Sequence, residues 1–228
     1  MAKKNAKDNT IINVDEVYTK TEKFVDKNRK LLTLVLGGAV LIILSFMGYR
    51  LLVLLPAEKK AEEATFQAED YFAIGSLDSA QYGDGVSAGL EEIMKDYSGT
   101  YAASRAAFQV GVINRNARKF EEAIQAFDKV DLDDDVIGPM SLAGMGDCYS
   151  DLKDYAHAAE YFLKAADAAD AGLAGKVLSP SYHYKRAITL IELGRTKEAK
   201  DVLSHIVSEH PNPDSPEYQT AVALGESL

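Results

Sequence analysis

The sequence predicts an all-α protein in which a single transmembrane helix is followed by a right-handed α-solenoid, a row of stacked helix pairs. Three observations lead to this fold class. An apolar stretch near the N-terminus is long enough to cross a bilayer as a helix. The chain after it shows helical periodicity interrupted by Gly, Pro and Asp clusters, without the alternation of half-buried strands. In that region small and aromatic residues also recur in a fixed order.

The apolar stretch runs from Leu31 to Leu55 and reads LLTLVLGGAVLIILSFMGYRLLVLL. Its first 19 residues, 31–49, carry no charge. As a helix they extend about 28 Å, which matches a hydrocarbon core of about 30 Å. A core helix of a soluble protein would be shorter and amphipathic. A cleaved signal peptide is disfavoured by the 30 preceding residues and by the lack of a clear A-x-A site. We therefore expect an uncleaved transmembrane anchor over 31–55.

The segments on either side of this anchor differ in charge. Residues 1–30 hold eight Lys and Arg against five Asp and Glu, a net charge of +3. Residues 57–228 hold 16 against 30, a net charge of −14. The positive-inside rule then places the N-terminus in the cytoplasm and the large acidic domain on the far side of the membrane. The acidity of this domain also argues against nucleic-acid binding.

Two shorter features accompany the anchor. Residues 1–13 are polar and predict a disordered cytoplasmic tail. Apolar residues in 14–30 recur at steps of three and four, as in an amphipathic cytoplasmic helix that lies on the membrane or docks on a partner. The alternative is a helix that only extends the anchor. Within the anchor, small residues on one face predict a docking surface for another membrane helix. They are Gly37, Gly38, Ser45 and Gly48.

A pattern of small and aromatic residues repeats after the anchor. Two units place Gly, Ala and Phe at identical intervals: Gly111, Ala123 and Phe127, then Gly146, Ala158 and Phe162. The offset between these units is 35 residues, and a third unit places Ala187 in the position of Gly146 after an offset of 41. The pattern resembles the tetratricopeptide repeat, a 34-residue helix-turn-helix. Gly or Ala lets paired helices cross closely, while the aromatic rings fill the gaps between them.

This resemblance divides the periplasmic domain, residues 57–228, into helix pairs. The expected units are a degenerate pair over 57–98, repeats at about 104–138, 139–175 and 180–213, and a capping helix over 215–228. Asn114 and Leu190 depart from the family because they stand where Tyr is usual. The Gly-rich segment AGLAGKVLSP explains the longer second interval as an extended loop. A second Gly-rich loop, around Tyr82 and Gly83, joins the two helices of the degenerate pair.

No group of side chains predicts catalysis, a metal site or a cofactor. Asp131, Asp133 and Asp135 imitate the start of a calcium loop, but the turn glycine and the bidentate Glu of such a loop are missing. The sole cysteine, Cys148, lies in an apolar helical run and fits a small buried side chain. The histidines lack the i, i+4 spacing that places two ligands on one helix face. They are His157, His183, His205 and His210.

Solenoids of this kind usually bind peptides on the concave surface formed by the first helix of each pair. The repeat frame gives a candidate peptide-binding groove with these members: Arg105, Phe108, Val112, Arg115, Asn116, Met140, Asp147, Asp151, Tyr184, Ile188 and Ile191. Asp147 and Asp151 stand where a clamp for C-terminal carboxylates would need Lys and Asn. We therefore expect an apolar or basic peptide segment as ligand. The alternative is a solvated inner face without a ligand.

The order of basic tail, single anchor and acidic repeat domain, through GLEEIMKDYSGTYAASRAA, resembles the YfgM-like ancillary subunits of the bacterial Sec translocon. This resemblance implies a non-enzymatic, single-pass protein of the bacterial inner (cytoplasmic) membrane with its repeat domain in the periplasm. The implied partners are the SecYEG channel and a periplasmic chaperone or prolyl isomerase, with no cofactor. A different hypothesis is a scaffold of another envelope assembly, such as outer-membrane biogenesis or division. Regulation of an enzyme through the cytoplasmic helix is less favoured.

Overall fold

A computed structural model describes residues 14–131 and 133–228, so the tail predicted at 1–13 lies outside the described residues. The chain divides into two units, residues 1–53 and 54–228. Every regular element in the described ranges is a helix. The all-α prediction, with a long apolar N-terminal helix followed by helical repeats, is confirmed.

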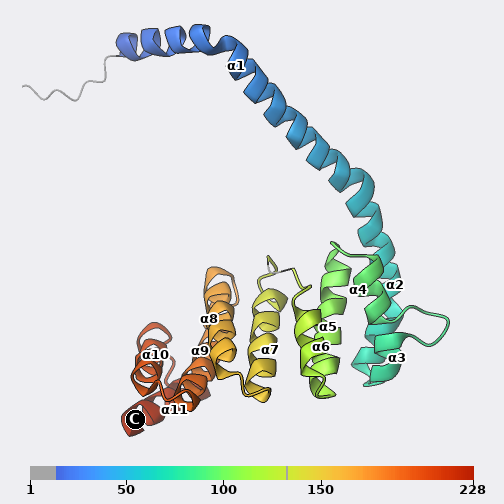
Figure 1. Cartoon of the computed structure of the whole chain (residues 1–228), viewed down its shortest axis with the longest axis vertical. Helices are drawn as coiled ribbons and strands as arrows, with labels where there is room; N and C mark the ends of the chain where they lie inside the picture. Colours follow the sequence, from blue (N-terminus) through green and yellow to red (C-terminus); the bar gives the residue numbers. More distant parts are fainter. Residues whose placement is uncertain (1–13, 132) are drawn as a thin grey trace, which may run out of the picture. The chain divides into compact units, whose positions relative to one another are not determined.

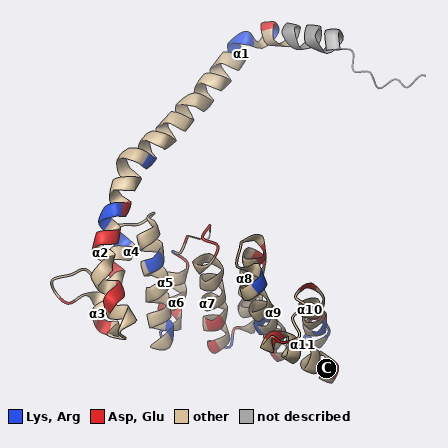
Figure 2. Cartoon of the chain, turned by 180° about the vertical axis from the view of Figure 1, so that it is seen from behind, with Lys and Arg blue, Asp and Glu red and all other residues tan. Residues whose placement is uncertain are grey.

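The first unit contains one long helix, α1 (Val14–Tyr49), which a π-helical segment, η1 (Arg50–Leu54), follows directly. α1 passes without a break through the boundary between the expected amphipathic helix and the expected anchor. Its apolar side chains are exposed, with Leu34 at 74 % and Ile42 at 71 %. Figure 2 shows a long stretch of α1 that carries no charged residue. A helix of this length and composition could cross a membrane.

The second unit is a row of helices joined by short connections (Figure 1). The described helices of residues 54–228 are α2 (Leu55–Ala73), α3 (Leu77–Tyr82), α4 (Leu90–Asp96), α5 (Tyr101–Asn116), α6 (Phe120–Phe127), α7 (Ile137–Asp151), α8 (Tyr155–Ala171), α9 (Gly175–Glu192), α10 (Thr196–Glu209) and α11 (Pro216–Ser227). Three hairpins, α5–α6, α7–α8 and α9–α10, carry the repeated sequence pattern. The first helices also contact one another in the order α2, α5, α7, α9 and α11. We call these five helices the first-helix row.

Glycine and phenylalanine fit together where neighbouring helices meet. A Cβ atom on Gly111 of α5 would lie 2.6 Å from Cδ1 of Phe127, and one on Gly144 of α7 would lie 2.7 Å from Cζ of the same ring. A Cβ on Gly146 would lie 2.7 Å from Cε1 of Phe162 on α8. Real Cβ atoms do not approach a ring so closely. In each of these contacts one aromatic ring packs directly on the backbone of a glycine, and this contact sets the distance between the two helices. The regular spacing of Gly and Phe in the sequence therefore reflects helix packing.

The turns inside the three hairpins share one backbone conformation. Arg118, Lys153 and Gly194 occupy equivalent positions just after the first helix, with φ of 62°, 62° and 71°. In each turn the next residue's N–H donates to a carbonyl five residues earlier, for example Asp154 N to Tyr149 O at 2.9 Å. This is the Schellman arrangement that ends many helices. Only one of the three turns has the glycine that this conformation favours.

Two connections differ from the sequence prediction. The loop expected around Tyr82 and Gly83 is preceded by α3, a short helix that buries Ala80 and Gln81. The extended loop expected in AGLAGKVLSP is wrong, because only residues 172–174 separate α8 from α9. The extra residues instead lengthen α9, where Pro180 is buried within the helix. The first helix of the third repeat therefore begins at 175 rather than near 180.

Asn114, which stands where the repeat pattern usually has Tyr, pairs with a second buried amide, that of Gln81. Asn114 and Gln81 are both buried, and Gln81 Nε2 donates to Asn114 Oδ1 at 3.1 Å. The same nitrogen donates to Glu91 Oε1 at 2.6 Å. The amides of α3 and α5 therefore meet where a tyrosine would otherwise fill space. This contact fixes α3 against the first repeat.

Candidate functional site

The residues of the candidate groove lie on α5, α7 and α9 of the first-helix row. Asn116 and Asp151 are exposed, and Met140 and Ile188 are exposed to 37 % and 36 %. The other members are half-buried. They are Arg105, Phe108, Val112, Arg115, Asp147, Tyr184 and Ile191.

Asp147 of α7 joins three successive first helices. Arg115 of α5 pairs with it at 3.1 Å, from Nη2 to Oδ2. Lys185 of α9 donates from Nζ to both carboxylate oxygens, at 2.8 and 2.9 Å. The Asp147 side chain is only 15 % exposed. The negative charge of Asp147, which we expected to favour a basic ligand, is therefore already neutralised by Arg115 and Lys185 of the same chain.

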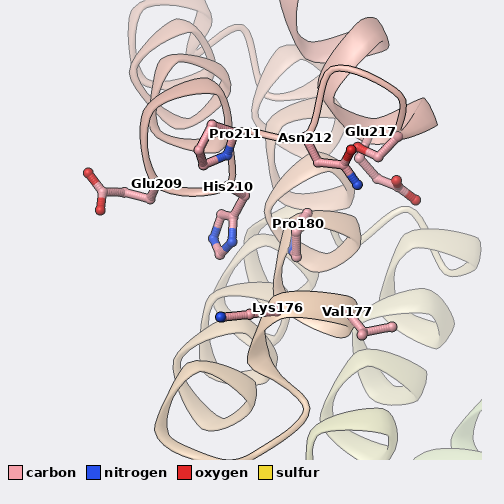
Figure 3. Close-up of a pocket in the computed structure, with 9 residues that line it drawn as sticks. Lys176, Val177, Pro180, Glu209, His210, Pro211, Asn212 and Glu217 are labelled. Atoms are coloured by element: carbon pink, nitrogen blue, oxygen red, sulfur yellow. The ribbon is translucent and has the colours of Figure 1, made fainter.

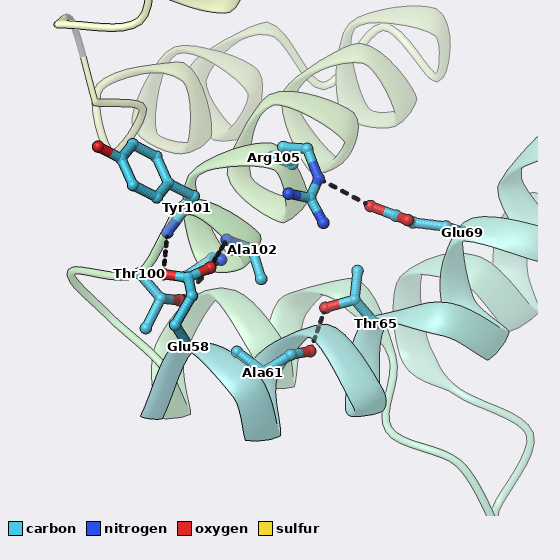
Figure 4. A network of polar contacts seen from close by, with 9 residues as sticks. Glu58, Ala61, Thr65, Glu69, Thr100, Tyr101, Ala102 and Arg105 are labelled. Atoms are coloured by element: carbon cyan, nitrogen blue, oxygen red, sulfur yellow. Dashed lines mark hydrogen bonds and ion pairs between the residues drawn. The ribbon is translucent and has the colours of Figure 1, made fainter. Parts of the chain in front are cut away.

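Polar contacts also attach α2 to the first repeat (Figure 4). Tyr101 N and Ala102 N donate to the two carboxylate oxygens of Glu58, at 2.8 and 3.0 Å. This carboxylate lies at the N-terminus of α5, where free backbone N–H groups favour a negative charge. Further along α2, Glu69 accepts from Arg105 Nε at 3.2 Å. Arg105 is thus held in place by α2.

The apolar groove residues pack against different parts of the core. Phe108 and Val112 contact the cluster built around Phe127 and α8, and the Phe108 and Phe127 rings lie 5.9 Å apart at a tilt of 56°. Tyr184 and Ile191 contact the cluster of α9, α10 and α11. The predicted residues therefore lie along one row of helices, but many of them contribute to packing. Met140 and Ile188 are the apolar members that remain most accessible.

The small residues of the expected docking face lie on α1. A Cβ atom built on Gly37, Gly38 or Gly48 would meet nothing within 4 Å, and Ser45 is exposed. No contact within the described chain therefore requires glycine at these three positions. The docking face remains a prediction about another helix.

A cluster of three histidines was missed by the spacing argument. His183 comes from α9, His205 comes from α10, and His210 is the capping residue directly after α10. One ring nitrogen from each of the three lies within 4.8 Å of the other two. Burial, followed by the nearby His205, lowers the pKa of His183 to about 4. The i, i+4 criterion could not reveal this cluster, because its members come from two packed helices and a helix end.

The helices and contacts described above define a class of protein: an α-solenoid of helix hairpins stacked through small and aromatic residues. The tetratricopeptide repeat family matches residues 141–171 and 182–213. A solved chain described as kinesin light chain TPR-like repeats from Podosopora anserina has a similar fold, with a TM-score of 0.55 and 12 % identity. The similarity covers 75 % of this chain and 86 % of that one. No curated protein sequence matches the chain. The chain therefore combines a long apolar N-terminal helix with helical repeats, two of which match the tetratricopeptide repeat.

Proposed function

We propose that the protein is a membrane-anchored, non-enzymatic scaffold that binds other proteins through its tetratricopeptide repeats. The observation that carries this proposal is the apolar stretch 31–55, whose large side chains are exposed in a chain that also folds an extensive repeat domain. Exposed apolar surface of this length is stable in a bilayer and a liability in water. Tetratricopeptide repeats typically bind proteins rather than catalyse reactions.

The anchor can be tested separately from any partner. A chain tagged at both ends should remain in the membrane pellet after alkaline carbonate extraction, with both tags on one polypeptide. A matched control replaces Leu34, Ile42 and Leu52 with Asp, which makes a bilayer span costly. Release of the unaltered chain, or loss of its N-terminal tag, would contradict an uncleaved anchor and favour a signal sequence.

The more specific proposal is an accessory subunit of the Sec translocon in the bacterial inner membrane. Its support is the order of basic tail, single anchor and acidic repeat domain, which resembles the YfgM-like subunits. In this proposal the N-terminus is cytoplasmic, the anchor docks beside the SecYEG channel, and the periplasmic repeats bind a chaperone, a prolyl isomerase or emerging polypeptides. Confinement near the channel exit raises the effective concentration of a weak binder. A scaffold of outer-membrane biogenesis or division is the alternative.

Purification of the tagged protein from native membranes in mild detergent, with mass spectrometry of the bound proteins, separates the two hypotheses. The translocon proposal predicts near-stoichiometric recovery of channel subunits. It also predicts that exchanging residues 31–55 for an unrelated membrane span abolishes their recovery. A periplasmic scaffold should keep its partners after the exchange. Recovery of a different envelope complex without channel subunits would remove the translocon proposal.

A further inference from the structure

The histidine cluster lies in the last repeat, on α9 and at the C-terminal part of α10. The His183 and His205 rings meet edge to face with centroids 4.8 Å apart, and the His210 centroid is 6.2 Å from His183 and 6.1 Å from His205. Three imidazoles from sequence positions up to 27 residues apart therefore converge on one point. Neither the repeat frame nor scaffold function accounts for this convergence.

His183 shows why the cluster is more than ordinary packing. It is only 5 % exposed, and neither Nδ1 nor Nε2 has a hydrogen-bond partner among the described residues. Nε2 of His210 is also buried without a partner there. A buried polar atom without a partner costs free energy. An apolar side chain would fill the same space on α9 without this cost, so the unpartnered nitrogens favour a bound ligand at this position.

We propose that His183, His205 and His210 bind one divalent late transition-metal ion of the Zn²⁺ class. Imidazole nitrogen is a preferred donor for such ions. Tetrahedral ligands at about 2.0–2.1 Å from the ion lie roughly 3.4 Å from one another. The ligand nitrogens are now up to 4.8 Å apart. Rotation of the exposed His205 side chain and the half-exposed His210 side chain would shorten these separations to about that value.

The surroundings supply negative charge and access. Asp170 Oδ2 lies 3.8 Å from His183 Nε2 and can serve as a fourth ligand or orient the ring. His183 and His205 line a cavity of about 410 Å³, together with Asp167, Glu198, Asp201 and the single cation Arg186. On the other side, His210 lines a cavity of about 620 Å³ with Lys176 and Pro180 (Figure 3). An ion can therefore reach the three rings from solvent.

Binding would join the end of α10 to α9. His210 is the capping residue directly after α10, and α11 begins six residues later. The site thus links the last repeat to the segment that leads into the capping helix. This role is independent of which protein the scaffold binds.

The test uses the full chain in mild detergent, carrying a tag without histidines and freed of metal with a chelator. Zn²⁺ is titrated by calorimetry, and Co²⁺ is added as a probe whose visible absorption reports nitrogen coordination. We expect one ion per chain, an unfolding midpoint that rises with Zn²⁺, and no competition from excess Mg²⁺ or Ca²⁺, which prefer oxygen ligands. His205→Gln and His210→Gln should each weaken Zn²⁺ binding by about a hundredfold or more.

The matched control is His157→Gln, an exposed histidine of α8 that pairs with Asp154 and lies outside the cluster. It should leave Zn²⁺ affinity unchanged. His183→Gln should also abolish binding, but its burial can impair folding, so the two more accessible histidines carry the test. Equal binding by the unaltered chain and the His205→Gln, His210→Gln double variant would overturn the proposal. Equal loss of affinity in His157→Gln would overturn it as well.

Discussion

Gly146 of α7 lies against the ring of Phe162 on α8, so closely that a Cβ atom would sit 2.7 Å from Cε1 and 2.8 Å from Cδ1. Phe162 is 2 % exposed and cannot swing into solvent. The two residues set the separation of the helices in the second repeat. The same relationship joins Gly111 to Phe127 in the first repeat.

Gly146→Ala should therefore lower the free energy of unfolding by about 1 to 2 kcal/mol, because overpacking outweighs the helix propensity that alanine adds. Urea unfolding followed by circular dichroism measures this change. Gly225→Ala on α11 is the control, because its nearest neighbour would be 3.9 Å away. It should be neutral or slightly stabilising. Stabilisation by both substitutions would show that the Phe162 ring does not restrict position 146.

The turn conformation at Lys153 and Gly194 gives a second prediction. Exchanging the residue type at these two equivalent positions should change the unfolding free energy in opposite directions. Both residues have positive φ, which costs a non-glycine residue roughly 1 kcal/mol. Lys153→Gly should raise the unfolding free energy by about 0.5–1 kcal/mol, and Gly194→Lys should lower it by a similar amount. Thermal unfolding of both variants checks the pair. If both substitutions changed the unfolding free energy in the same direction, the two turns would not have the same conformation.

Asp147 gives a third prediction, because it separates two cations. Asp147→Asn keeps the side-chain shape but leaves Arg115 and Lys185 beside a neutral amide. We expect a loss of about 1 to 2 kcal/mol in unfolding free energy, a moderate value because both cations are more than a third exposed. Asp151→Asn, one turn later on the same helix and exposed, should change stability by less than about 0.5 kcal/mol.

High salt should weaken the difference between these two variants, since it screens ion pairs. If Asp147→Asn also proves neutral, the ion pairs of Asp147 with Arg115 and Lys185 do not contribute to stability. If Asp151→Asn lowers the unfolding free energy as much as Asp147→Asn does, the loss arises from the change in net charge and not from the two ion pairs.

Cys148 gives a fourth prediction, about reactivity. Its side chain is fully buried in α7, and burial raises the pKa of the thiol to about 12. The thiolate is the reactive form, so the native protein should resist iodoacetamide in mildly alkaline solution. In denaturant the same cysteine should react at the rate of a free thiol. Mass spectrometry of both samples measures the difference, and rapid labelling of the native chain would contradict the burial.

The all-α fold and its repeats could be predicted because their cause is local. Small and aromatic residues at fixed intervals are the packing contacts themselves, as Gly111 and Gly146 show. The early start of α9 could not be predicted in the same way. Glycine and proline in 171–180 usually indicate a loop, and here tertiary packing of a buried Pro180 overrides that preference.

The candidate site was harder to predict because its character depends on partners distant in sequence. The repeat frame assigned Asp147 to the first-helix row but could not reveal that Lys185, 38 residues away, holds its carboxylate. The histidine cluster could not be predicted from the sequence for a related reason. Its members are neighbours only after α9 and α10 pack together.

The buried amide pair of Gln81 and Asn114 gives the last prediction. Gln81→Leu leaves the Asn114 carbonyl buried without its donor, which should cost about 1 to 3 kcal/mol of unfolding free energy. Asn114→Leu should cost a comparable amount, since Gln81 then loses one of its two acceptors. The double variant should be more stable than the two separate losses predict, because both polar groups are removed together. Urea unfolding of all four proteins completes this cycle. Strict additivity would mean that the 3.1 Å contact carries no coupling and that α3 is fixed to α5 by apolar packing alone.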